Sequence, residues 1–180
     1  MSRYVPVSTD DFAEFYQGSY GRVVALVAAI VGERHQAEDI AQEAFARALT
    51  RWSRVARYDL PEAWVRRVAL RLTIDASRRT RRAVALSARL AAGQRGAQRD
   101  PHDPLAATAL SVALMRLPLA QRQVVVLYYL ADLPVAEIAR DCGVSVGTIR
   151  TRLAAARHRL ERELAECDSA DASEEVPRAR

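Results

Sequence analysis

The chain has 180 residues, which is enough for one ordinary domain or two small ones, each with a modest core. Its longest apolar run, Val23 to Val31, is too short to span a bilayer, so we expect a cytoplasmic protein with no membrane insertion. The net charge is +5, and the separated cysteines, Cys142 and Cys167, predict neither a disulfide nor a metal site.

Apolar residues recur at helical spacing through most of the chain, beginning after Thr9 and Asp10, which can cap a first helix. Pro61 stands where proline is favoured, in the first turn of a later helix. We expect helices at about residues 9–32, 36–55, 61–82, 105–116, 119–131, 135–142 and 145–165. No strand pattern and no internal repeat is visible in the sequence, so the predicted fold class is all-α.

A stretch without periodicity separates the helices into two groups. Residues 93–104, GQRGAQRDPHDP, combine glycine, proline and charge, which predicts a flexible linker. We therefore expect two small helical domains, the C-terminal one a helix-turn-helix. The predicted boundaries are 1–82 for the first domain, 83–111 for the linker with flanking helical segments, 112–167 for the second domain and 168–180 for a disordered tail.

Charge is distributed unevenly within the first predicted domain. Residues 1–50 contain 4 arginines against 7 acidic residues, whereas residues 51–82 contain 10 arginines against 3 acidic residues. The net charge of the two segments therefore changes from −3 to +7, so they should face different partners. A dense cationic segment is typical of nucleic-acid binding, although a merely solvated arginine-rich helix is the alternative.

The segment from Pro134 to Ala165 fits a helix-turn-helix position by position. Gly143 lies where a residue free to adopt positive φ would end one helix, and Ser145 is placed to cap the next. Four apolar residues have the spacing of a small core between the two helices: Ile138, Val144, Ile149 and Leu153. Such a unit usually reads DNA, the alternative being the solvated surface of an ordinary helical hairpin.

The second helix of this motif is predicted to carry a cationic face opposite its apolar one. That face contains Arg150, Thr151, Ala154, Arg157 and His158. Arginine can bridge O6 and N7 of guanine in the major groove or hold phosphates. The face is therefore a candidate for DNA binding.

Two separate blocks of the sequence resemble one protein family. The stretch LPLAQRQVVVLYYLADLPVAEIARDCGVSVGTIRTRLAAARHRL resembles the promoter-reading C-terminal domain of bacterial RNA polymerase sigma factors of the extracytoplasmic-function (ECF) group. The stretch FAEFYQGSYGRVVALVAAIVGERHQAEDIAQEAFARAL resembles the polymerase-binding region of the same group, and RYDLPEAWVRRVALRLTIDASRRTRR resembles its minus-10 region. The resemblance covers about residues 10–82 and 112–165, and the order of the two blocks is more specific than either block alone.

The resemblance implies a polymerase-binding face on the second predicted helix. Asp39, Gln42 and Glu43 fall at i, i+3 and i+4, so they share one side of a helix. They match the DxxQE pattern with which the family docks on the coiled coil of the polymerase beta-prime subunit, and Leu49 belongs to the same predicted site. The alternative is that Glu38 and Asp39 only favour a helix N-terminus electrostatically.

The third predicted helix corresponds, by resemblance, to the part of the family that melts and reads the minus-10 element. The predicted minus-10 DNA-binding residues are Arg66, Arg67, Arg71, Arg78 and Arg79. Residues 58–64 supply a loop that could accept a flipped base, while Trp64 is expected in the core. Many ECF members carry asparagine where this chain has Arg71, which leaves the base read by that pocket undefined.

In the C-terminal block the resemblance implies contact with the minus-35 element. The predicted minus-35 DNA-binding residues are Ser145, Thr148, Arg150, Thr151, Ala154, Arg157 and His158. At Ala154 and Ala155 some relatives carry larger or charged groups. This chain is therefore expected to rely on Arg150, Thr151 and DNA shape.

The sequence as a whole predicts an initiation factor without catalysis or cofactor of its own. Its expected partners are the RNA polymerase core, through the beta-prime and beta subunits, and promoter DNA; the sequence leaves open an anti-sigma factor as a further partner. A freestanding helix-turn-helix regulator that binds its operator as a dimer is the alternative. An enzyme is disfavoured, because no Ser/His/Asp set, phosphate loop or metal-ligand cluster is visible in the sequence.

Overall fold

The computed structural model describes residues 9–90 and 108–174, and every regular element in these ranges is helical. The chain divides into two compact units, Met1–Gln98 and Arg99–Arg180. The predicted linker, residues 93–104, lies outside the described residues.

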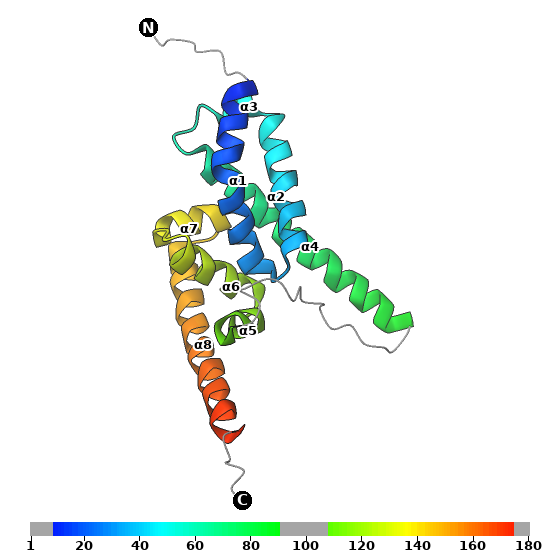
Figure 1. Ribbon diagram of the computed structural model, residues 1–180, viewed down its shortest axis with the longest axis vertical. Helices are drawn as coiled ribbons and strands as arrows, with labels where there is room; N and C mark the ends of the chain where they lie inside the picture. Colours follow the sequence, from blue (N-terminus) through cyan, green and yellow to red (C-terminus); the bar gives the residue numbers. More distant parts are fainter. Residues whose placement is uncertain (1–8, 91–107, 175–180) are drawn as a thin grey trace, which may run out of the picture. The chain divides into compact units, whose positions relative to one another are not determined.

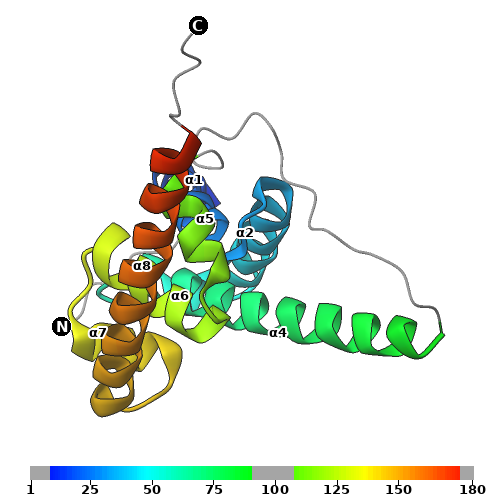
Figure 2. The same cartoon turned by 90° about the horizontal axis from the view of Figure 1, so that it is seen from below.

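The first unit consists of α1 (Thr9–Val31), α2 (Arg34–Leu49), the short α3 (Trp52–Val55) and α4 (Pro61–Leu90). Helices α1 and α2 lie side by side, and both pack against the N-terminal half of α4 (Figure 1). The C-terminal half of α4 continues beyond the other helices of the unit, as the second view also shows (Figure 2). The helix starts predicted at Thr9 and Pro61 are confirmed.

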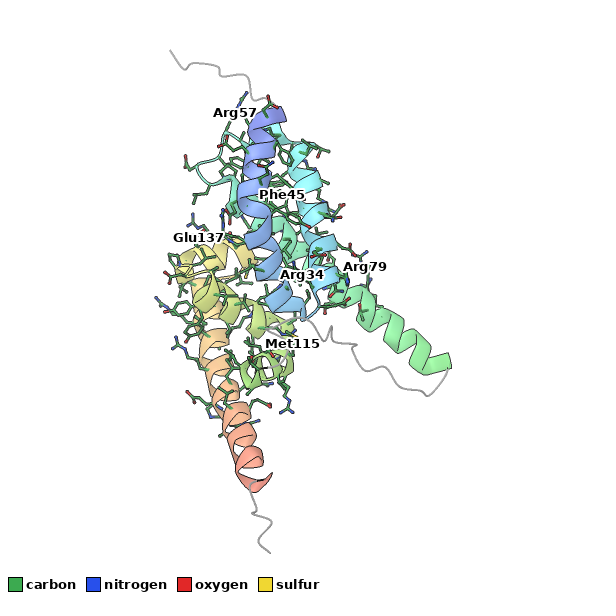
Figure 3. The ribbon with its side chains drawn as sticks, in the orientation of Figure 1. Arg34, Phe45, Arg57, Arg79, Met115 and Glu137 are labelled. Atoms are coloured by element: carbon green, nitrogen blue, oxygen red, sulfur yellow. The ribbon has the colours of Figure 1, made fainter. Side chains whose placement is uncertain are left out.

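The core of the first unit depends on small residues of α2. Its inward face is formed by Ala37, Ala41, Ala44 and Ala48, all fully buried. Alanine lets neighbouring helices approach closely, and the large ring of Phe45 fills the space between α1 and α2 (Figure 3). Val27 and Val65, both with no exposed surface, contribute to this core from α1 and α4.

The prediction of one continuous helix from Gln36 to Val55 is wrong. The helical conformation is interrupted at Thr50 and Arg51, between α2 and α3. The hydroxyl of Thr50 donates to the carbonyl of Arg47 at 3.0 Å, closing the last turn of α2. The break lets Trp52 stack on Phe15, with ring centroids 5.0 Å apart. Tertiary packing of these aromatic rings thus overrides the local helical pattern.

The helix predicted to end near Arg82 instead continues to Leu90. Residues 83–90, AVALSARL, contain good helix formers and no glycine or proline, so the backbone keeps its helical conformation. The amphipathic pattern fades there because this part of α4 has left the core of the unit.

The second unit consists of α5 (Ala109–Arg116), α6 (Leu119–Val125), the π-helical turn η1 (Val126–Leu130), α7 (Val135–Cys142) and α8 (Val146–Glu174). Helices α5, α6 and α7 all pack against α8 (Figure 2). The predicted helix 105–116 is described only from Ala109 onwards, and Thr108 caps it by accepting from the Ser111 amide at 3.2 Å.

The predicted helix-turn-helix is present in α7 and α8. Gly143 has φ +67° and ends α7, and the Val144 amide donates to the Ala139 carbonyl at 3.0 Å. The hydroxyl of Ser145 accepts from the Thr148 amide at 3.1 Å, so Ser145 caps α8 as predicted. Ile138 and Ile149 are fully buried between the two helices.

Helix α8 runs on to Glu174, whereas the sequence predicts a disordered tail from Asp168. No glycine or proline interrupts the segment before Pro177, and its alanine and glutamate residues favour helix. Residues 175–180 lie outside the described residues.

The turn of the helix-turn-helix generates a stability prediction. Gly143→Ala should lower the free energy of unfolding by about 1–2 kcal/mol, because an L-residue is strained at positive φ. A Cβ at Gly143 would meet no atom within 4 Å, so the loss would be conformational and not steric. Urea denaturation followed by circular dichroism measures the change.

Gly18→Ala in α1 is the matched control for this substitution. Its Cβ would also meet nothing within 4 Å, but Gly18 lies inside a regular helix, so alanine should stabilise the protein by about 1 kcal/mol. Equal effects of the two substitutions would contradict the role assigned to Gly143.

Candidate functional site

The outer face of α2 carries the predicted polymerase-binding residues together. Asp39, Gln42 and Glu43 are exposed, and Leu49 keeps 49% of its surface exposed near the end of the helix. The opposite face is buried in the core of the first unit through its alanines. Two carboxylates, an amide and an apolar side chain are thus presented by one helix.

The position of the acidic residues argues against the alternative that Glu38 and Asp39 only favour the N-terminus of the helix electrostatically. Helix α2 begins at Arg34 and its first turn contains no acidic residue, so Glu38 and Asp39 lie beyond the turn where a carboxylate favours the helix dipole. Glu38 accepts from Arg34 at 2.9 Å, and Glu43 accepts from Arg47 at 2.8 Å. These exposed pairs contribute little to stability.

The predicted minus-10 arginines lie on α4, and helical spacing divides them. Arg67, Arg71 and Arg78 fall on one side, whereas Arg66 and Arg79 flank it. Arg71, Arg78 and Arg79 are exposed, and Arg66 and Arg67 are half-buried. The Nε of Arg67 donates to the Ala63 carbonyl at 3.1 Å, so part of its guanidinium is held against its own helix. Figure 3 shows Arg79 where α4 leaves the rest of the first unit.

The connection between α3 and α4 presents two large apolar side chains to solvent. Tyr58 and Leu60 are exposed by 36% and 63%. The chain that follows is anchored by an ion pair of 2.5 Å between Glu62 and Arg22 of α1, which raises the pKa of Arg22. Trp64 packs against the core of the unit, as predicted. The loop is thus exposed, while the start of α4 that follows it is held by Glu62 and Trp64.

The predicted cationic face of α8 is exposed, and its apolar side is buried. The exposed residues are Ser145, Arg150, Thr151, Ala154, Arg157 and His158. Ile149, Leu153 and Ala156 face inward. Thr148 is half-buried, and its hydroxyl lies 2.9 Å from that of Ser145, so the two side chains are paired at the N-terminus of α8. The hydroxyl of Thr151 donates to the Gly147 carbonyl at 3.1 Å.

Arg157 differs from the other arginines of this face because two tyrosines hold it. Its Nε donates to the hydroxyl of Tyr129 at 2.6 Å, and the guanidinium carbon lies 5.6 Å and 5.8 Å from the ring centroids of Tyr129 and Tyr128. The hydrogen bond to Tyr129 raises the pKa of Arg157. These tyrosines could not be predicted as partners of Arg157 from the sequence, since they precede it by 29 and 28 residues and carry no local signal.

Cys142 is half-buried beside the turn of the helix-turn-helix. Burial, together with the neighbouring Asp141, raises the pKa of its thiol to about 11.

In the part of the chain that the structure describes, no group of three or more His, Cys, Asp or Glu side chains could hold a metal ion. Nor does a helix in that part have the length and apolarity to cross a membrane.

Comparisons with known proteins place both units in one family. Residues 15–83 match the family described as sigma-70 region 2, and residues 107–160 match sigma-70 region 4. The ECF RNA polymerase sigma factor SigW of Bacillus subtilis is 31% identical over 171 residues, which cover 86% of this chain and 89% of SigW. The chain belongs to the ECF group of the sigma-70 family.

Other relatives of this sigma factor agree with that placement. The ECF sigma factor SigE of Mycolicibacterium smegmatis is 33% identical over 156 residues, covering 82% of this chain and 59% of SigE. A solved structure of the sigma factor RpoE of Bartonella quintana, in complex with the anti-sigma factor NepR, has a TM-score of 0.67 at 21% identity. It covers 87% of this chain and 98% of RpoE, and at this identity it shows the shared fold.

The raised pKa of Cys142 predicts an unreactive thiol. In a Cys167→Ser background, a thiolate-directed reagent at pH 7.5 should modify Cys142 at least tenfold more slowly than free cysteine, because the thiolate fraction falls tenfold for each unit by which the pKa rises. The rate should increase with pH up to about 11 and should reach that of free cysteine once urea unfolds the chain. Modification of the folded chain at the rate of free cysteine would contradict the burial of this thiol.

Proposed function

We propose that this sigma factor binds core RNA polymerase through its first unit and directs the polymerase to specific promoters for transcription initiation. The observation that carries the proposal is the order of the two matches, sigma-70 region 2 before sigma-70 region 4, each on its own helical unit. A freestanding regulator that binds an operator as a dimer is not favoured, because such a protein would have no need of a region 2.

The proposed polymerase-binding site is the exposed face of α2. The side chains of Asp39, Gln42 and Glu43 lie on one face of α2, where they provide negative charge and hydrogen-bonding groups. This face is complementary to a basic partner helix such as the beta-prime coiled coil. Leu49 adds an exposed apolar contact beside them. The beta subunit is the second expected partner within the core.

The proposed contact with the minus-10 element lies on α4 and the loop before it. Arg66, Arg67, Arg71, Arg78 and Arg79 would neutralise phosphates of the melted strand. The exposed Tyr58 and Leu60 offer surfaces against which an unstacked base could pack.

The proposed contact with the minus-35 element is the exposed face of α8. The N-terminal residues of a recognition helix reach base edges in the major groove, which favours Arg150 and Thr151 as the readers. Ser145, Thr148, Ala154, Arg157 and His158 complete the proposed surface. Since Ala154 and Ala155 offer only methyl groups, little base-specific contact should come from the middle of the helix.

The remaining assignments follow from this function. We assign residues 1–82 to the polymerase and minus-10 domain and 112–167 to the minus-35 domain, joined by the segment 83–111. The protein itself would catalyse no reaction, since the polymerase performs the chemistry, and it would act in the cytoplasm. An anti-sigma factor, such as the one bound to RpoE of Bartonella quintana, is a further expected partner.

The polymerase-binding face can be tested by charge reversal. Replacing Asp39 and Glu43 together with arginine should abolish co-elution with core polymerase in gel filtration, because like charges placed against a basic helix cost several kcal/mol. Both positions are exposed, so the melting temperature measured by circular dichroism should change only slightly.

The matched control reverses two exposed carboxylates on a different helix, Asp10→Arg with Glu14→Arg in α1. This variant should co-elute with core polymerase like the wild type. Normal co-elution of the folded α2 variant would refute the assignment of the face. A wild type that never co-elutes with its cognate core would refute the sigma-factor function.

The minus-35 surface can be tested by run-off transcription. Arg150→Ala should weaken transcription from promoters recovered from genomic fragments, since a bidentate arginine contact provides about 1–3 kcal/mol of discrimination. Binding to core polymerase should not change. Arg159 is exposed on the opposite side of α8 from Arg150, half a turn around the helix axis. The Arg159→Ala variant loses the same charge and should support normal transcription. Equal transcription by all three proteins would exclude Arg150 as a reading residue.

A further inference from the structure

The π-helical turn η1 brings two tyrosines to one side of α8. The amide of Ala131 donates to the carbonyl of Val126 at 3.2 Å, a bond that spans five residues instead of four. Within this wider turn the rings of Tyr128 and Tyr129 meet edge to face, with centroids 4.9 Å apart. Both rings lie within cation–π distance of the Arg157 guanidinium.

The tyrosines orient Arg157 without neutralising its charge. Tyrosine is uncharged at neutral pH, so the guanidinium keeps its full positive charge. The hydrogen bond to Tyr129 uses Nε, and the guanidinium also interacts with the side chain of Tyr128. Since a guanidinium has five N–H donors, further donors are left to bind an anion. Both Arg157 and Tyr129 are exposed, the tyrosine by 55%, so this anion-binding group is accessible.

The position of Arg157 along α8 favours a phosphate over a base as its ligand. Arg157 lies seven positions after Arg150, which is two turns or about 10 Å along the helix. Bases are read by the first turns of a recognition helix, and residues farther along meet the phosphate backbone. Arg157 also lies toward the edge of the exposed face, near the buried Leu153 side, where α8 meets η1.

We propose that Tyr129, assisted by the ring of Tyr128, is a positioning residue that holds Arg157 for contact with a DNA phosphate. Arg157 then sets the affinity and register of the minus-35 domain, while Arg150 reads sequence. An arginine that is oriented in advance loses less side-chain entropy on binding, which is the physical advantage of the tyrosine pair. This inference rests on the proposed function, because it requires the α8 face to meet promoter DNA.

The test measures binding of the holoenzyme to two DNA fragments, a promoter recovered by run-off transcription and the same fragment with its minus-35 element scrambled. Arg157→Ala should weaken binding about tenfold on both fragments and should make the negative slope of log K against log salt less steep by about 0.9. Tyr129→Phe keeps the ring and removes the hydroxyl, and should weaken binding about threefold on both. Arg150→Ala, by contrast, should weaken binding only on the intact promoter.

A double-mutant cycle separates positioning from direct contact. In the Arg157→Ala background, Tyr129→Phe should have no further effect, since the group that it positions is gone. Equal losses from Tyr129→Phe in both backgrounds would overturn the inference, because Tyr129 would then act independently of Arg157. No loss in either background would overturn it as well. Melting temperatures of all variants should equal that of the wild type.

The phosphate contact can be refuted while the proposed function still holds. Suppose that the wild-type holoenzyme transcribes from the promoter, but that the Arg157 and Tyr129 variants bind DNA with the wild-type affinity and salt slope. This result would overturn only the phosphate contact. Failure of the wild-type chain to direct any transcription with its cognate core would overturn the proposed function and the phosphate contact together.

Discussion

The close packing of α1, α2 and α4 around the alanine face of α2 is the constraint on which the first unit depends. Because Ala37, Ala41, Ala44 and Ala48 are fully buried, the rotation of α2 about its axis is fixed. That rotation alone decides that Asp39, Gln42 and Glu43 point outward. A larger side chain at any of the four alanines would push the helices apart or force side chains out of favourable rotamers, at a cost of about 1–3 kcal/mol.

In the second unit the corresponding constraint is the turn between α7 and α8. Gly143 at positive φ and the cap provided by Ser145 set the angle at which α8 leaves the turn. Ile138 and Ile149 then lock the two helices together through fully buried contacts. The exposed face of α8 is a result of this arrangement, since its opposite side must cover the small core. The ion pair between Arg116 and Glu163 at 2.5 Å adds a link from α5 to the later part of α8.

Most of the helices could be predicted from the sequence because each has a local signal, such as a cap, a proline or a regular apolar repeat. The break at Thr50 and Arg51 could not, since its cause is the stacking of Trp52 on Phe15, a contact 37 residues apart in sequence. The extension of α4 to Leu90 could not be predicted either, because the amphipathic pattern ends before the helix does. The exposed faces of α2 and α8 follow from helical periodicity, whereas the contact of Tyr129 with Arg157 depends on how two distant elements pack.

The aromatic cluster that causes the break after α2 also has an optical consequence. The chain has two tryptophans, Trp52 and Trp64, and both belong to the first unit. Trp52 is nearly buried among Phe12 and Phe15, so its indole emission should be shifted toward shorter wavelengths in the native state. Tryptophan fluorescence therefore reports on the first unit alone, and the helix-turn-helix of the second unit can unfold without changing that signal directly.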